Sequence, residues 1–320
     1  MRPIRAAVIG AGAFGQNHIR VLRQLAGVEL AAIIDIDPSR GLPKAELELE
    51  QFSAAIVATP TLTHEEIAAK LLEAGIDVLV EKPIAGSSAG GHRLARLANE
   101  RGRILQVGHL ERFNPAVLAL EKRLTIPLFF EIHRLSVFTP RSLDVDVVLD
   151  LMIHDLDIVL SLTRELPIEI RAAGISVLSS RVDIANARLA FPSGCIANLT
   201  ASRVSTEKVR KLRLFQPGEY ISLDYQRQEA LRVAVRGGES GSLPDIGFER
   251  LPTEPAEPLE AELKAFFGAV RDRSEPKVNG SQASQALQVA EAILDKIEEH
   301  SNLVAETIRQ ANLLHSKNVV

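Results

Sequence analysis

A lysine at the end of a predicted strand could hold or pass on a proton. Lys82 lies between Glu81 and Pro83 in the run DVLVEKP (77–83), whose apolar residues predict a buried strand that Pro83 ends. Burial lowers the pKa of an amine, which would suit Lys82 to donate a proton or a hydrogen bond to a substrate hydroxyl. A surface lysine paired with Glu81 is the alternative.

Two carboxylates and an imidazole form a second set with catalytic potential. Asp150 and His154 are four residues apart and would share one face of a helix, with Asp157 one turn beyond His154. An imidazole oriented by a carboxylate can take the proton of a hydroxyl while its hydride leaves. A structural His–Asp pair and a metal site are the alternatives. The sequence has neither a cysteine pair nor an H-x-x-x-H spacing, so we expect no metal.

The stretch AAVIGAGAFGQNH (6–18) predicts a site for a dinucleotide, because an apolar strand breaks into a glycine turn and then becomes helical in period. Gly10 permits the tight turn, Gly12 lets the backbone approach a pyrophosphate, and Gly15 lets the helix pack closely on the strand. The new helix would begin beside the phosphates with free N–H groups, at Ala13 and Phe14.

Asp35 favours NAD over NADP as the cofactor. It ends the next apolar run, ELAAIID (29–35), twenty residues after Gly15. Its carboxylate can accept hydrogen bonds from both ribose hydroxyls of an adenosine, whereas a 2′-phosphate would meet like charge. Arg40 lies near enough to weaken this preference.

These residues need a parallel sheet to position them. Helices predicted over 63–75 and 87–102 alternate with strands over 54–60, 77–83 and 103–109. Such alternation predicts a doubly wound parallel sheet covered on both faces, an α/β fold whose ligands lie at the C-terminal ends of the strands. Between Ile36 and Ser53 only eighteen residues remain, with one helix-prone piece over 44–52. We therefore expect that an edge strand or a helix is missing there.

The strand ends collect further polar candidates. For the cofactor we expect contacts from Thr59, Pro60, His64, Glu81 and Lys82, and for the substrate from Lys82, Arg112, Asn114, Asp150 and His154. Helix capping and surface polarity are the alternatives for His64, Arg112 and Asn114. Scattered positive charges suited to phosphate or carboxylate, or else to solvent, are Arg134, Arg141, Arg203 and Arg213.

The second half of the chain has a different pattern. After a helix over 111–124, strand-like runs follow without helix-length crossovers, which predicts an α+β domain with a largely antiparallel open sheet. These runs cover 127–138, 185–192, 195–204, 211–218, 220–228 and 231–236. We expect a helix over 144–163, a loop over 236–258, two helices over 261–272 and 281–299, and an amphipathic tail over 302–315. The predicted domains are residues 1–122 and 123–320.

Composition excludes several classes of protein. The net charge of −4 and the lack of a long basic run argue against nucleic acid as a partner. The single cysteine, Cys195, lies in an apolar run and is expected to be a buried hydrophobe, so no disulfide forms within the chain. No apolar run reaches the roughly 18 residues of a membrane span. We expect a cytoplasmic protein without a signal peptide.

With these motifs in view, the chain resembles the Gfo/Idh/MocA oxidoreductases, which include glucose–fructose oxidoreductase and inositol dehydrogenase. The resemblance is carried by VIGAGAFGQNH, ATPTLTH, VEKPI and the D-x-x-x-H-D-x-D pattern of Asp150, His154, Asp155 and Asp157. It implies that Lys82, Asp150 and His154 are the catalytic groups. It also implies a homodimer or homotetramer joined through the open sheet of the second domain.

Two runs, GHLERFNPAV and LDLMIHDLDIVL, resemble the branch of the family that oxidises the 3-hydroxyl of UDP-N-acetylglucosamine for lipid A or surface polysaccharide. The leading hypothesis is therefore an NAD-dependent nucleotide-sugar dehydrogenase. A dehydrogenase of a free sugar or inositol is the alternative among enzymes. A non-catalytic NAD-binding sensor or scaffold is the alternative of another class.

Overall fold

The computed structural model describes residues 2–41, 51–139, 145–236 and 245–317 of the 320. The chain divides into two compact units, each made of two segments of sequence. The first unit contains Met1–Leu118 and Glu254–Gln288, and the second contains Ala119–Thr253 and Val289–Val320. The helix-prone piece over 44–52 lies almost wholly outside the described residues.

The first unit is built on a parallel sheet, as predicted. Its strands lie in the order β2-β1-β3-β4-β5. Its strands are β1 (Ile4–Ile9), β2 (Val28–Ile34), β3 (Ala54–Val57), β4 (Asp77–Glu81) and β5 (Leu105–Gly108). Its helices are α1 (Ala13–Leu22), η3 (Thr61–Thr63), α2 (His64–Glu73), α3 (Ser88–Arg101), η4 (Leu110–Phe113) and α6 (Pro258–Asp272).

The order of the strands reverses direction at β1, since β2 lies on one side of it and β3 on the other. Right-handed crossovers then place α1 on one face of the sheet and α2 and α3 on the opposite face. Strands β3 and β4 are buried along their whole length because helices cover both faces. The connections that follow β1 and β3 lead to opposite faces of the sheet at this switch point, where open α/β sheets bind their ligands.

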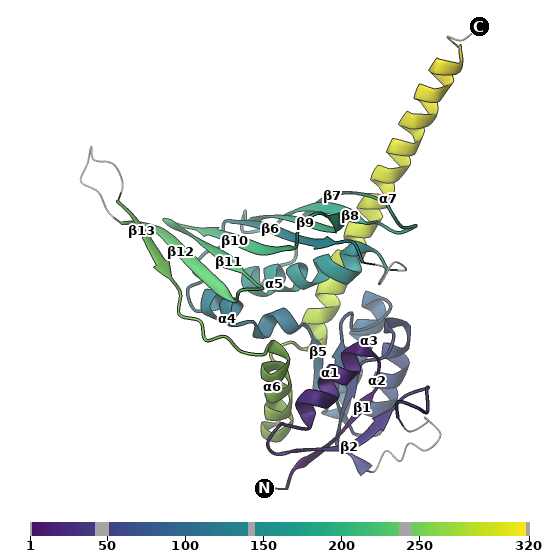
Figure 1. Ribbon diagram of the computed structural model, residues 1–320, viewed down its shortest axis with the longest axis vertical. Coiled ribbons are helices and arrows are strands. Elements are labelled where there is room, and N and C mark those ends of the chain that lie inside the picture. Colours follow the sequence, from purple (N-terminus) through teal and green to yellow (C-terminus); the bar gives the residue numbers. More distant parts are fainter. Residues whose placement is uncertain (1, 42–50, 140–144, 237–244, 318–320) are drawn as a thin grey trace. The chain divides into compact units, whose positions relative to one another are not determined.

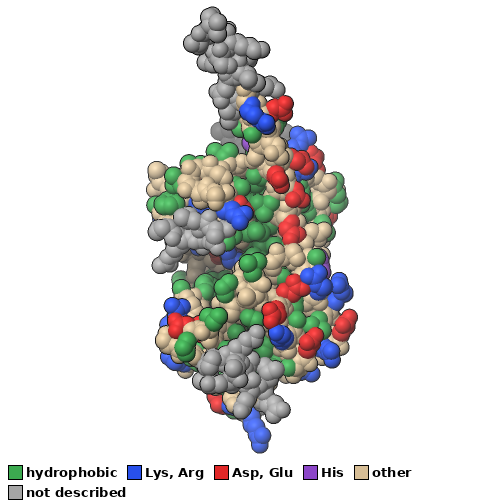
Figure 2. Space-filling view, turned by 90° about the vertical axis from the view of Figure 1, so that its right-hand side faces the viewer, with side chains coloured by type: hydrophobic (Ala, Val, Ile, Leu, Met, Phe, Trp, Pro, Cys, Tyr) green, Lys and Arg blue, Asp and Glu red, His purple; other side chains and the backbone are tan. Residues whose placement is uncertain are grey.

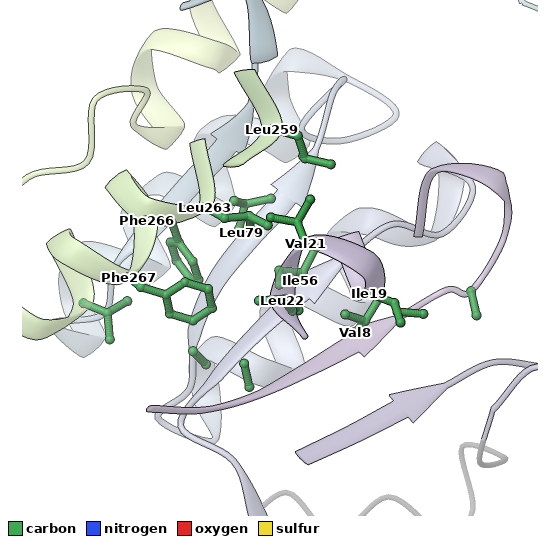
Figure 3. Close-up of a cluster of buried hydrophobic side chains, with 14 residues drawn as sticks. Val8, Ile19, Val21, Leu22, Ile56, Leu79, Leu259, Leu263, Phe266 and Phe267 are labelled. Atoms are coloured by element: carbon green, nitrogen blue, oxygen red, sulfur yellow. The ribbon is translucent and has the colours of Figure 1, made fainter. Parts of the chain in front are cut away.

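Helix α6 joins the first unit from far along the chain. Its side chains Leu263, Phe266 and Phe267 are at most 2% exposed and pack against Val21 and Leu22 of α1 (Figure 3). This division differs from the contiguous domains expected from the sequence. The physical reason is that an apolar face of α6 completes a core that the first 118 residues leave open.

The helix predicted over 111–124 is interrupted. It is replaced by η4 and by α4 (Pro115–Glu121), with Asn114 between them in extended conformation at ψ 127. Pro115 disfavours helical geometry in the residue before it, and the Asn114 side chain accepts a hydrogen bond from Ala116 N at 3.0 Å. Asn114 thus caps the new helix.

The second unit contains an eight-stranded sheet in the order β13-β12-β11-β10-β6-β9-β8-β7. Its strands are β6 (Phe129–Val137), β7 (Glu169–Ile175), β8 (Ile184–Ala190), β9 (Ile196–Ser205), β10 (Val209–Gln216), β11 (Glu219–Asp224), β12 (Glu229–Arg236) and β13 (Asp245–Arg250). The pairs are antiparallel except β6 with β9, which confirms the predicted fold class.

Two strands of this sheet were not predicted. β7 lies at one edge, and β13 at the other edge falls inside the segment 236–258 that was expected to be a loop. The glycine and proline around β13 mask its short alternating pattern. It pairs with β12 along its whole length, from Leu231–Arg250 to Arg236–Asp245.

Helical segments cover one face of the second sheet. The helix predicted over 144–163 is a π-helical turn, η5 (Val148–Met152), followed by α5 (Ile153–Thr163), which lies along the sheet (Figure 1). The predicted closing helix and tail form one helix, α7 (Gly280–Lys317). No glycine or proline occurs where a break was expected, so nothing ends the helix there.

Acidic and basic side chains are interspersed over the face shown in Figure 2. Among the described helices, none combines the length and the apolar character required to cross a lipid bilayer.

Candidate active site

The glycine turn after β1 has the geometry that its sequence predicts. Gly10 has φ +92, and a Cβ there would lie 2.6 Å from Ala58 O. A Cβ on Gly15 would lie 1.9 Å from Gly10 O, so only glycine lets α1 approach the turn this closely. Both residues therefore serve the packing of the turn.

Gly12 and the start of α1 form an open cradle. A Cβ on Gly12 would meet no described atom within 4 Å, and Gly12 is the N-cap of α1 without any side chain capping it. No acidic residue lies in the first turn, which begins with Ala13 and Phe14. Uncapped N–H groups with the positive end of a helix dipole fit the pyrophosphate of a dinucleotide.

Asp35 follows β2 and is tied to the glycine turn. Its carboxylate accepts hydrogen bonds from Ala11 N at 2.6 Å and from Asp37 N at 2.8 Å. The Arg40 side chain lies 3.0 Å from the carboxylate of Asp37. Asp35 therefore holds the turn in place in addition to offering negative charge beside it.

His64 clamps two neighbouring strand ends. Its imidazole is 1% exposed, with Nδ1 2.8 Å from Pro83 O and Nε2 2.8 Å from Thr59 O. The Thr63 hydroxyl lies 2.8 Å from the Thr59 hydroxyl and 2.8 Å from Pro60 O. The ring of His64 is thus engaged by backbone carbonyls, and its contact with the cofactor stays a prediction.

Lys82 is half-buried in a turn whose flanking residues are both anchored. The Lys82–Pro83 peptide bond is cis, and His64 binds the carbonyl of Pro83. On the other side, Glu81 Oε1 lies 2.7 Å from His18 Nε2 of α1. A Cβ on Gly108 would come within 2.9 Å of Glu81 Oε2, so this glycine makes room for the carboxylate. Glu81 is thus engaged by His18, and its contact with the cofactor stays a prediction.

Arg112 and Asn114 follow the end of β5. Arg112 is 7% exposed and lies in η4, so the surface alternative considered for it does not apply. Asn114 caps α4 and also donates to the Glu111 carboxylate at 3.2 Å. Their roles in binding substrate stay predictions.

Asp150 and His154 lie in the second unit, at the junction of η5 and α5, and both are half-buried. A π-helical turn has i→i+5 hydrogen bonds and is wider than an α-helical one, so their four-residue spacing is not that of a straight α-helix. Such turns occur frequently at functional sites. Since Lys82 belongs to the first unit, its convergence with these two residues stays a prediction.

Asp155 has a structural partner. Arg134 of β6 donates two hydrogen bonds of 2.8 Å to the Asp155 carboxylate, and both side chains are 2% exposed. The guanidinium also lies 5.0 Å from the ring centre of Tyr225. This bidentate pair fixes α5 on the sheet next to His154. Arg134 is therefore a buried anchor and not a scattered surface charge.

The other arginines with predicted charge roles are also engaged where they are described. Arg203 binds the carbonyl of Val145, and Arg213 lies 3.0 Å from the Glu131 carboxylate. Arg141 lies outside the described residues.

Cys195 is buried, and burial followed by the negative charge of Glu165 raises the pKa of its thiol to about 11. This environment suppresses the thiolate that a nucleophile requires. Within the described part of the chain, no three His, Cys, Asp or Glu side chains gather as a metal site would require.

Sequence reasoning missed two buried groups, His18 and Glu262. His18 lies one helical turn after Gly15, and this i, i+3 spacing from the glycine turn signals a residue on the sheet-facing side of α1. Glu262 lies three residues after Leu259 and one before Leu263, within the apolar face of α6. A carboxylate on an apolar face was the available signal.

Two family models match the chain. Residues 4–109 match the oxidoreductase family with an NAD-binding Rossmann fold, and residues 130–216 match the GFO/IDH/MocA C-terminal domain. The first unit and the second sheet therefore each have a counterpart in one family.

Individual relatives agree with the family models. UDP-N-acetylglucosamine 3-dehydrogenase of Acidithiobacillus ferrooxidans is 35% identical over 278 residues, 83% of this chain and 88% of the relative. A solved structure of UDP-N-acetylglucosamine 3-dehydrogenase GnnA from the same organism superimposes with a TM-score of 0.88, covering 94% of this chain and 99% of the other. An inositol 2-dehydrogenase of Acidothermus cellulolyticus is 30% identical over 49% of this chain and 53% of its own. The chain therefore belongs to the GFO/IDH/MocA family and is an NAD-binding oxidoreductase of that family.

Proposed function

We propose that the protein oxidises the 3-hydroxyl of UDP-N-acetylglucosamine with NAD, as a step toward amino sugars of lipid A or surface polysaccharide. The observation that carries this proposal is the likeness to a UDP-N-acetylglucosamine 3-dehydrogenase over 83% of the chain and 88% of that relative. The similarity to an inositol dehydrogenase covers about half of each chain. Oxidation of inositol or a free sugar is therefore the second candidate.

Three side chains would carry the reaction. His154, oriented by Asp150, takes the proton of the hydroxyl, and Lys82 orients the oxygen or relays the proton. Bound NAD would supply the acceptor for the hydride that leaves the same carbon. The products are a ketone, NADH and one proton, which balances atoms and electrons. Arg112 and Asn114 would contact the substrate near Lys82.

NAD is the proposed cofactor in preference to NADP. The Asp35 carboxylate stands at the end of β2 beside the glycine turn, and a 2′-phosphate there would meet like charge. Arg40, the nearby cation considered as a phosphate partner, is paired with Asp37. This pairing supports NAD, because the Arg40 guanidinium already has a carboxylate partner.

A substrate screen tests the proposal. Purified protein is incubated with NAD and, separately, UDP-N-acetylglucosamine, myo-inositol and free sugars, and NADH formation is followed by absorbance. We expect turnover with UDP-N-acetylglucosamine, with the product identified as the 3-keto sugar by mass spectrometry. Turnover with inositol instead would favour the second candidate. Binding of NAD without turnover of any substrate would favour a sensor.

Two substitutions test the catalytic assignment. Lys82→Ala and His154→Ala should each lower turnover about 10²–10⁴-fold, the usual effect of losing a positioned acid or base. Affinity for NAD, measured by isothermal titration calorimetry, should change little. Lys70→Ala, which removes an exposed lysine of α2, is the matched control. Near-normal turnover in both variants would refute the assignment.

The resemblance to the family also supports a homodimer or homotetramer joined through the eight-stranded sheet. Light scattering during gel filtration measures the mass. A monomer at all concentrations tested would contradict this assignment.

A further inference from the structure

Glu262 is a carboxylate placed where a charge is costly. Its side chain is 0% exposed, and it lies on the face of α6 that carries Leu263 and Phe266 into the core of the first unit. Neither of its carboxyl oxygens has a hydrogen-bond partner among the described residues. An ionised carboxylate in such surroundings would lose its hydration without any compensating donor.

The neighbours of Glu262 form a small polar cluster within the first unit. Gln106 of β5 donates a hydrogen bond of 3.3 Å to the backbone carbonyl of Glu262. Glu81 lies close enough for its negative charge to act on Glu262, and it is itself bound to His18 at 2.7 Å. Burial, followed by this charge, raises the pKa of Glu262 well above its usual value of 4.5.

The balance of charges among His18, Glu81 and Glu262 also favours a neutral Glu262. His18 can contribute at most one positive charge, and its Nε2 already faces Glu81 Oε1. One imidazolium cannot neutralise two carboxylates. Ionisation of both Glu81 and Glu262 would therefore leave an unbalanced negative charge in the interior.

Other charged or titratable groups occur on the elements that surround α6. They are Arg20 and Arg23 with α1, Asp77 on β4, His109 after β5, and Glu111 and Arg112 on η4. Arg20 is committed to Glu257 at the start of α6, and Asp77 accepts from Arg273 at 2.6 Å.

We propose that Glu262 is held as a neutral carboxylic acid, so that it leaves the pairing of Glu81 with His18 undisturbed, and that the cluster of Glu262, Glu81 and His18 thereby positions Lys82. This inference deepens the proposed function and rests on it for the role of Lys82. Glu262 is a positioning residue, because it acts through Glu81.

The route from Glu262 to Lys82 is short. Glu81 directly precedes Lys82, and its carboxylate, which is bound to His18 of α1, lies near enough to Glu262 of α6 for its charge to act on that side chain. Pro83, directly after Lys82, is held by His64 of α2. Helices α1 and α2 thus restrain the two residues that flank Lys82, which limits where its ammonium group can lie.

The protonation of Glu262 is tested without any substrate. A carboxyl whose pKa is raised by folding keeps a proton that the unfolded chain releases above about pH 4.5. The free energy of unfolding therefore falls as the pH rises from about 4.5 toward the raised pKa of the folded protein. Glu262→Gln cannot ionise and should abolish this fall. We expect its melting temperature, relative to the wild type, to gain about 3 °C or more per pH unit between about pH 5 and 8. Glu260→Gln, on the same helix with a 46% exposed side chain, is the control.

A constant difference in melting temperature at every pH would overturn the neutral acid. Infrared spectroscopy gives a second readout that does not depend on the fold of a variant. The wild-type protein at neutral pH should show the carbonyl stretch of a buried, protonated carboxylic acid. Absence of that band would also overturn the proposal.

The positioning role is tested by turnover. Glu262→Leu removes the acid proton and should lower kcat about tenfold or more while the KM for NAD stays within about twofold. Glu262→Gln, which keeps a donor in place, should restore most of kcat. Equal kcat in all three proteins would overturn the positioning role. If the wild type turns over no sugar, the proposed function fails, and the pH dependence of stability still decides the state of Glu262.

Discussion

Asp35 serves the fold and, in the proposed function, also the choice of cofactor. Its oxygens accept from Ala11 N and Asp37 N, so it ties the end of β2 to the glycine turn after β1. The same negative charge lies where the ribose of an adenosine is expected. A hydrogen bond to a charged group contributes about 1.5–3 kcal/mol, which is enough to decide between NAD and NADP.

Asp35→Asn should therefore reduce the preference for NAD over NADP about tenfold or more. The single acceptor oxygen of Asn can still hold one backbone N–H group, so the turn should stay folded. The measurement is the ratio of kcat/KM for the two cofactors. Glu29→Gln, at the far end of β2 with a 52% exposed side chain, should leave the ratio unchanged. An unchanged ratio in Asp35→Asn would remove the basis for the choice of NAD.

At the scale of elements, the loop between β7 and β8 is organised by one carboxylate. Asp183 accepts hydrogen bonds from the backbone N–H groups of Val177, Leu178 and Ser179 at 2.6–2.9 Å and from the Ser179 hydroxyl at 2.7 Å. Burial alone would raise the pKa of Asp183, but these hydrogen bonds outweigh it and lower the pKa to about 2.

This loop also holds the segment that leads into η5. Val147 N donates to Val182 O at 2.9 Å, and Asp146 accepts from Val182 N at 2.9 Å. The loop at Asp183 is therefore continuous with the turn that carries Asp150. A substitution in this loop should therefore affect η5, the helical turn that carries Asp150.

The second unit should lose stability in acid through Asp183. Because the folded pKa is lowered, the contribution is present above the ordinary value of 3.8 and is lost as pH falls toward about 2. The contribution is about 2 kcal/mol. Asp183→Asn should flatten this part of the pH profile, measured by urea unfolding between about pH 5 and 2. Asp224→Asn, at the last residue of β11, is the control, and an equally steep profile in Asp183→Asn would contradict the assignment.

At the scale of the whole molecule, the first unit is completed by a segment from near the end of the chain. Helix α6 contributes Leu263, Phe266 and Phe267 to the core beside α1, and it also supplies Glu262 (Figure 3). The stability of the cofactor-binding unit therefore depends on residues that follow the whole antiparallel sheet in sequence. The polar cluster behind Lys82 depends on the same helix.

Phe266→Ala should destabilise the first unit by about 3–5 kcal/mol, since it removes a fully buried ring and leaves a cavity. The measurement is urea unfolding of the full chain, read together with affinity for NAD. Lys264→Ala changes a 62% exposed side chain on the same helix and should cost little. Equal effects of the two substitutions would show that α6 does not belong to this core.

The sequence by itself determined the parallel sheet, the glycine turn and most strands of the second sheet. These features depend on patterns within a few residues, such as the buried run of β4 or the alternation Ala185, Ala187, Leu189 in β8. The break before Pro115 was also visible in the sequence, and it was missed because the apolar spacing continued through it. Edge strand β13 was missed because turn residues surround it.

Only the tertiary structure decided what long-range packing controls. It assigned α6 to the first unit, turned Glu81 inward to His18, and paired Arg134 with Asp155. Each of these contacts joins residues far apart in the chain, and the free energy that selects them comes from burial and from the pairing of charges removed from water. The local spacing of residues does not specify such partners, because the same residue types would be exposed to solvent and unpaired in another fold.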